Sequence, residues 1–123
     1  MRDHNKLTAF KLADDLVIHT YRVTAKFPKE ELFGLTSQMR RAAASAPTNI
    51  VEGCARESEA NYLNFLDIAY GSLKELHYQY TIAVRLDYIE QKEFENCELK
   101  LIETEKVLAA LIRSLRKKRP PNT

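Results

Sequence analysis

The chain has 123 residues, 45% of them hydrophobic and 29% charged, and its formal net charge is +2 at pH 7. This length suits one domain, and the composition excludes a disordered or fibrous protein. No apolar run approaches the roughly 20 residues needed to cross a bilayer, and the charged opening MRDHNK is unlike a secretory signal. We therefore expect a single domain over residues 1–123, located in the cytoplasm and not in a membrane.

The first predicted helix runs from about residue 8 to residue 26. Its stripe of mostly apolar residues alternates steps of four and three, which is the spacing of a helix packed in a bundle, and consists of Ala9, Ala13, Leu16, Thr20, Val23 and Phe27. The helix ends at Phe27-Pro28, because a residue that precedes proline disfavours helical dihedral angles.

The second predicted helix spans residues 36–56 and bends near Pro47. Thr36 or Ser37 can cap its start. A proline inside a helix costs about 3 kcal/mol, and a glycine such as Gly53 costs about 1 kcal/mol relative to alanine. We expect close packing of the many small residues in this segment against a neighbouring helix to offset both costs.

Two longer helices are predicted at residues 58–86 and 90–118. Ser58 caps the first of them, and Gly71-Ser72 forms a notch that the alanines of the second helix can approach. The apolar stripes again step by three and four, at Tyr62, Leu66, Ala69, Leu73, Leu76, Tyr80 and Ala83, and at Phe94, Cys97, Leu101, Thr104, Leu108, Leu111 and Leu115. Because short connections make sequential helices neighbours, the pattern predicts an all-α fold, an antiparallel up-down-up-down four-helix bundle.

Motifs for chemistry are missing from the sequence. No Glu-x-x-His pair of the di-iron bundles occurs, and there is neither a phosphate-binding glycine loop nor a G-x-S-x-G elbow. His4, His19 and His77 are isolated in sequence, and Asp15 with His19 is interpreted as a surface pair. Cys54 and Cys97 fall on apolar faces, as buried free thiols do. We therefore predict no metal site, no cofactor and no enzymatic activity.

The second helix carries an ordered polar face opposite its apolar one. Uncharged polar side chains lie between an arginine and a glutamate about three turns apart, which favours a shared hydrogen-bonding network over a solvated face. The predicted members are Arg41, Ser45, Asn49, Glu52 and Arg56. The sequence leaves open whether this network lies in the mouth of the bundle, between subunits or around a ligand.

The carboxyl end of the last helix concentrates positive charge at Arg113, Arg116, Lys117, Lys118 and Arg119. Clustered Lys and Arg are typical of nucleic-acid contacts, and they also complement the dipole of a helix end. Arg40 can extend this basic surface only if the fold brings it to the same side.

Two segments carry a family resemblance. FPKEELFGLTSQMRRAAASAPTNIVEGCAR and LNFLDIAYGSLKEL resemble the four-helix-bundle proteins encoded in intervening sequences of 23S ribosomal RNA, and also the accessory variability determinant proteins of diversity-generating retroelements. The resemblance implies a ring-shaped homo-oligomer, in these families a homopentamer. It also implies association with RNA or DNA, and in the retroelement group action beside a reverse transcriptase.

These observations together predict a non-enzymatic, oligomeric bundle that binds structured RNA or DNA through phosphate contacts of its basic residues. The alternative is a protein-interaction scaffold, or an accessory subunit for a nucleic-acid enzyme such as a reverse transcriptase. A bundle that binds a small molecule is the third reading.

Overall fold

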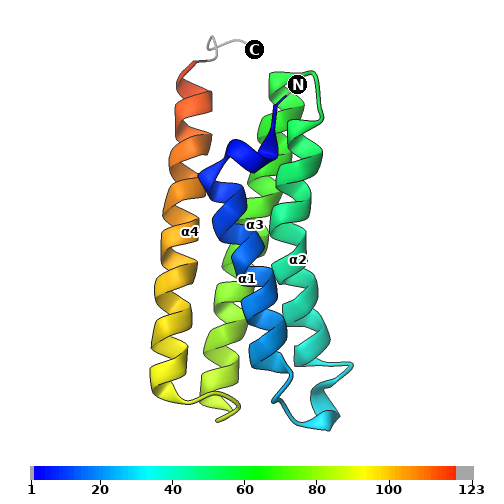
Figure 1. Cartoon of the computed structure of the whole chain (residues 1–123), viewed down its shortest axis with the longest axis vertical. Coiled ribbons are helices and arrows are strands. Elements are labelled where there is room, and N and C mark those ends of the chain that lie inside the picture. The colour runs from blue at the N-terminus through cyan, green and yellow to red at the C-terminus, as the bar shows by residue number, and fades with distance from the viewer. Residues whose placement is uncertain (1, 119–123) are drawn as a thin grey trace.

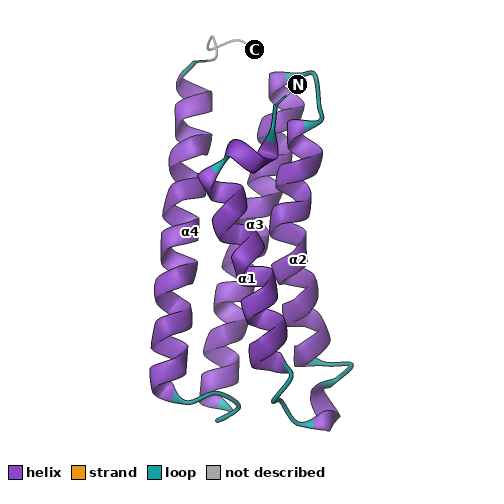
Figure 2. Cartoon of the chain, viewed as in Figure 1, coloured by secondary structure: helices purple, strands orange, loops and turns teal. Residues whose placement is uncertain are grey.

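The computed structural model describes residues 2–118, which form four long α-helices and two single-turn 3-10 helices (Figures 1 and 2). This range contains no strand, so the all-α prediction with four helices is confirmed. The helices begin and end within two residues of the predicted positions; their bounds are η1 His4–Lys6, α1 Thr8–Thr24, η2 Lys29–Glu31, α2 Leu35–Cys54, α3 Glu59–Arg85 and α4 Gln91–Lys117. None of these helices is long and apolar enough to cross a membrane.

The apolar stripes predicted from the sequence meet along the axis of the bundle and form its core. On α2 the inward residues are at most 1% exposed: Met39, Ala43, Ala46, Ile50 and Cys54. The stripes of α3 and α4 contribute the large buried side chains, among them Tyr80, Leu66, Leu73, Leu101 and Leu108. Leu111 and Leu115, near the end of α4, are only half-buried. The core is therefore continuous through the four helices but thinner where α4 ends.

The close approach of α2 to α3 occurs at Gly53. A Cβ atom placed on Gly53 would lie 2.9 Å from the Cβ of Phe65 and 3.2 Å from the Cδ1 of Tyr62. The predicted notch at Gly71 is wrong, because Gly71 is exposed and no atom lies within 4 Å of a Cβ built there. Only its neighbour Ser72 faces α2. The helix α2 continues through Pro47, which is buried.

The starts of α2 and α3 are capped differently. Ser58 caps α3 as predicted, because its hydroxyl accepts a hydrogen bond from the Asn61 N–H. The prediction of Thr36 or Ser37 as the cap of α2 is wrong, since this helix already begins at Leu35. The Leu35 N–H instead donates to the carboxylate of Glu31 at 3.1 Å, from the preceding turn η2.

Glu31 also joins the two connections at one end of the bundle. Its second carboxylate oxygen accepts a hydrogen bond from the Tyr88 hydroxyl at 2.8 Å, and the Tyr88 ring packs on Phe27. The bond from the Leu35 N–H and then that from Tyr88 lower the pKa of Glu31. One carboxylate therefore starts α2 and ties the α1–α2 connection to the α3–α4 connection.

The end of α3 is closed by a turn in which Asp87 has a φ of 62°. The Tyr88 N–H donates to the Ala83 carbonyl and the Asp87 N–H donates to the Val84 carbonyl. This is the Schellman arrangement, in which the left-handed position is usually glycine. Aspartate tolerates that conformation better than most residues.

Side-chain contacts show which helix ends lie together. Lys26 after α1 pairs with Glu93 near the start of α4, at the end of the bundle where the α1–α2 and α3–α4 connections lie (Figure 1). Arg116 near the end of α4 pairs with Asp67 near the start of α3, toward the opposite end. The described beginning of the chain lies at this second end as well.

Candidate nucleic-acid interface and polar clusters

The basic end of α4 is solvent-exposed. Arg113, Arg116, Lys117 and Lys118 all lie on its last turns or at its cap, where cations complement the helix dipole. Arg119 lies outside the described residues. Arg116 donates to Asp67 on α3 at 2.6 Å, and both side chains are about half exposed. We call the five basic residues between positions 113 and 119 the basic end.

Arg40 does not extend the basic end. Its Nε donates to the Thr24 hydroxyl at 2.9 Å, and its guanidinium lies 4.6 Å above the centre of the Tyr21 ring. Both partners belong to the last turns of α1, at the end of the bundle away from Arg116 (Figure 1). The reason is the direction of α2, which starts beside the end of α1, so that a residue in its second turn lies far from the last turns of α4.

The predicted polar network on α2 contains only two of its five members. Asn49 donates to the Ser45 hydroxyl at 3.0 Å and to the Ser45 carbonyl at 2.8 Å. The Ser45 hydroxyl lies 2.8 Å from that of Ser72 on α3, so the network joins two helices of the same chain. Arg41 and Glu52 are exposed and stand outside it. The remaining predicted member, Arg56, is also outside it.

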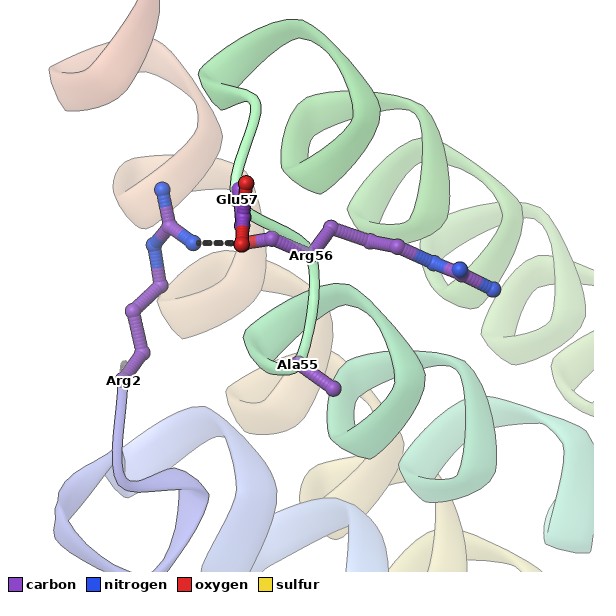
Figure 3. Close-up of a pocket in the computed structure, with 4 residues that line it drawn as sticks. All are labelled: Arg2, Ala55, Arg56 and Glu57. Carbon is purple, nitrogen blue, oxygen red and sulfur yellow. Dashed lines mark hydrogen bonds between the residues drawn. The ribbon is translucent and has the colours of Figure 1, made fainter.

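Arg56 lies in the turn between α2 and α3, beside a pocket of about 440 Å³ (Figure 3). Its guanidinium stacks over the Phe65 ring at 4.9 Å, and its carbonyl accepts a 2.7 Å hydrogen bond from Arg2. Arg2 also pairs with Glu59 at 3.1 Å and lies 4.0 Å above the centre of the Tyr62 ring. The Arg2 and Arg56 guanidinium groups point to opposite sides of the turn (Figure 3), so the pair does not form an anion clamp.

The sequence predicted an isolated His77, but this residue lies between two carboxylates of α4. Its Nδ1 is 2.7 Å from Glu105 Oε2, and its Nε2 is 3.0 Å from Glu98 Oε2. A neutral imidazole has one N–H, so donation to both carboxylates requires the protonated ring. Burial alone lowers the pKa of His77, but the hydrogen bonds and charges of Glu98 and Glu105 outweigh it and raise that pKa. Lys74 is a second partner of the buried Glu105, at 3.4 Å.

His19 faces Cys97 of α4 at 3.0 Å, so its interpretation as a surface pair with Asp15 is wrong. Burial lowers the pKa of His19, and burial raises the pKa of Cys97 to about 11. Both shifts favour the neutral forms, whereas a nucleophilic cysteine requires a thiolate. The pair is therefore an interhelical hydrogen bond rather than a catalytic dyad. Cys54 and Cys97 are both free and buried.

Metal-ligating side chains do not converge in the described part of the chain. Residues 2–118 contain no group of three or more His, Cys, Asp and Glu side chains arranged to hold a metal ion. In the cluster around His77, both ring nitrogens already face carboxylates.

Comparison with known proteins shows a family and solved structures of similar fold. The family model described as 23S rRNA-intervening sequence protein matches residues 5–110. The crystal structure of a protein with unknown function from the S23 ribosomal protein family of Bacteroides thetaiotaomicron VPI-5482 has a TM-score of 0.78 and 22% identity, covering 85% of this chain and 95% of that chain. This likeness shows the same fold. No curated protein matches the chain. The family match ends at residue 110, before Arg113.

Proposed function

Because this chain belongs to the family of 23S rRNA-intervening sequence proteins, we propose that it is a non-enzymatic, cytoplasmic bundle that binds structured RNA or DNA. The observation that carries the proposal is the basic end, where exposed cations gather on the last turns of one helix. Contacts from such residues to phosphates position a nucleic acid without reading its sequence. They also make the affinity strongly dependent on salt, because each neutralised phosphate releases counterions.

Assembly is the second part of the proposal. Each chain is an up-down-up-down bundle, and the chains form a ring-shaped homo-oligomer, a homopentamer by resemblance to the family. Support comes from large apolar side chains that are exposed where the two connections lie, with Phe33 93%, Leu32 51% and Leu86 49% exposed. Exposed apolar surface of this kind marks contacts between proteins. A ring repeats the basic end in every subunit, so that weak phosphate contacts add up.

The test measures binding to fragments of 23S rRNA over a range of salt concentrations. In one variant Arg113, Arg116, Lys117, Lys118 and Arg119 are replaced by Gln. In the matched control five other cations are replaced, the exposed Lys6, Lys11, Arg22, Lys29 and Lys92. The slope of log K against log salt is negative, and each lost phosphate contact reduces its magnitude by about 0.7 to 0.9. The first variant is expected to lose most of the affinity and the slope, and the control to keep both.

Two outcomes contradict the proposal. Affinity that is unchanged at high salt, or unchanged in the variant of the basic end, removes the electrostatic mechanism. A monomer in native mass spectrometry across micromolar concentrations removes the assembly.

A protein-interaction scaffold is the second candidate, and in particular an accessory subunit for a nucleic-acid enzyme such as a reverse transcriptase. The exposed Phe33 supports it, because a partner protein would cover that side chain as well as another copy would. This function predicts little intrinsic binding of nucleic acid and the capture of one specific enzyme in pull-down experiments. Phe33→Ser should abolish that capture.

A further inference from the structure

A groove lies between α3 and α4 next to the basic end. It consists of two adjoining cavities of about 500 and 140 Å³ that share Tyr70, Ala109 and Arg113 as lining residues. The larger cavity continues toward Ile102, Glu105 and Lys106, and the smaller one toward Asp67, Ile112 and Arg116. We call this the α3–α4 groove.

The lining of the α3–α4 groove is apolar at its centre. Tyr70 is half-buried, packs against the core and lines both cavities from α3. From α4, Ala109 and Ile102 line the larger cavity together with Tyr70, and both are apolar. A flat apolar group can enter such a space and lie against the tyrosine.

The charges around the groove are positive in sum. Both acids that line it are already paired, Asp67 with Arg116 at 2.6 Å and Glu105 with His77 at 2.7 Å. Lys106 and Arg113 make no ion pair or side-chain hydrogen bond within residues 2–118. The groove thus combines an aromatic ring with two cations that are available for an anion.

We infer that the α3–α4 groove binds an unpaired nucleotide, with the base stacked on Tyr70 and the flanking phosphates on Lys106 and Arg113. This combination of a stacking aromatic ring with cations along the backbone is the way proteins bind single strands. In a regular duplex the bases are stacked on one another and cannot reach the ring, so the groove selects loops, bulges and ends of structured RNA. The inference rests on the proposed function and adds to it the feature of the nucleic acid that is recognised.

Three variants test the role of Tyr70. Tyr70→Leu removes the ring, Tyr70→Phe keeps it, and Tyr78→Leu removes a more exposed tyrosine of the same helix that does not line the groove. The probes are a fluorescent uridine 12-mer, its thymidine DNA counterpart and a blunt RNA duplex. Tyr70→Leu is expected to weaken binding of both single strands by about five-fold or more and to leave the duplex unaffected. The other two variants should bind like the wild type, and circular dichroism should confirm that all three fold.

Lys106→Gln tests the phosphate contact without touching the basic end. For the single strands, it is expected to reduce the magnitude of the slope of log K against log salt by about 0.7, whereas Tyr70→Leu leaves that slope unchanged. Lys11→Gln, at an exposed position on α1, is the matched control and should have no effect.

Several results would overturn the inference. If Tyr70→Leu binds as the wild type does while the variant of the basic end loses binding, the proposed function stands and the groove is not the base site. A loss with RNA alone would assign the effect to the ribose and not to stacking. Dissociation of an oligomer by Tyr70→Leu would make the groove a contact between copies. If the wild type binds none of the probes, the proposed function falls together with the inference.

Discussion

His77 links protonation to the stability of the fold. Its folded-state pKa lies above the ordinary value of 6.5, because the hydrogen bonds to Glu98 and Glu105 outweigh its burial. A group with a raised folded pKa contributes stability that is fully present below the unfolded pKa and is lost as pH rises through the folded pKa. For His19, whose burial lowers the pKa, the sign is opposite, and its contribution is lost as pH falls below 6.5.

We predict that His77→Gln removes the pH dependence due to this cluster. The difference in unfolding free energy between wild type and variant should be largest near pH 5.5 and should shrink toward about pH 8.5. Urea denaturation across this range measures the difference. His19→Gln is the control, because its difference should change with pH in the opposite sense. A difference for His77→Gln that is constant with pH would mean that the ring is not protonated between the two carboxylates.

Asp87 provides a second prediction at this scale. Its φ of 62° is in the left-handed region, where a β-branched side chain is a steric outlier. Asp87→Val should lower the unfolding free energy by about 1–2 kcal/mol. Asp87→Gly should raise it, by less than about 1 kcal/mol, because glycine is also more flexible in the unfolded chain. Equal stability of the two variants in urea would show that the turn does not depend on this conformation.

Helices α2 and α3 lie close together at Gly53, whereas Gly71, the other helical glycine, is exposed. We predict that Gly53→Ala destabilises the protein by about 1–3 kcal/mol, since the new methyl group would lie 2.9 Å from the Cβ of Phe65. Gly71→Ala should stabilise it by about 0.5–1 kcal/mol, because the position is open and alanine favours the helix. Thermal unfolding of both variants measures the two changes. Stabilisation by Gly53→Ala would show that α2 can move away from α3 at no cost.

The elements could be predicted because their signals are local. The alternation of three and four residues places every helix, and Ser58 caps the next segment through a short-range bond. The start of α2 was misassigned for the same reason. Thr36 and Ser37 have the residue types of a cap, but the carboxylate that reaches the Leu35 N–H comes from Glu31 in the preceding turn. No local sequence pattern shows that Glu31, rather than Thr36 or Ser37, caps the start of α2.

The polar clusters could not be predicted because they depend on how two helices are set against each other. His77 and its carboxylates are 21 and 28 residues apart, and His19 is 78 residues from Cys97. A partial signal existed, since Glu105 follows Thr104 inside the apolar pattern of α4 and a carboxylate buried there needs a partner. Similarly, the basic end was visible in the sequence, whereas the distance of Arg40 from it follows only from the directions of α1 and α2.

The whole molecule has two chemically different ends. The described cations of the basic end lie on α4 toward one end, and the exposed Leu32, Phe33 and Leu86 lie at the other, where the two connections meet. Under the proposed function the first end contacts nucleic acid and the second contacts another copy of the chain. This division predicts that variants of the basic end keep the oligomer, whereas variants of the apolar end lose the oligomer and, with it, the part of the affinity that comes from multivalency.

Phe33→Ser tests the division. Because the side chain is 93% exposed, its loss should change the melting temperature of the isolated chain very little. We expect a shift toward the monomer in native mass spectrometry, together with weaker binding of structured RNA through loss of multivalency. Tyr78→Ser, also at an exposed aromatic residue, is the control. An unchanged oligomer in the Phe33 variant would move the subunit contact to another surface.

The two cysteines allow the opening of the bundle to be followed chemically. Cys54 lies at the end of α2 and is 1% exposed, while Cys97 lies in the second turn of α4 and is completely buried. Burial raises the pKa of both thiols, so neither reacts with iodoacetamide until its surroundings open and the thiolate can form. Alkylation rates of the Cys54→Ala and Cys97→Ala variants therefore report separately on local unfolding at two places in the molecule. Addition of RNA should slow alkylation at whichever place the nucleic acid holds together.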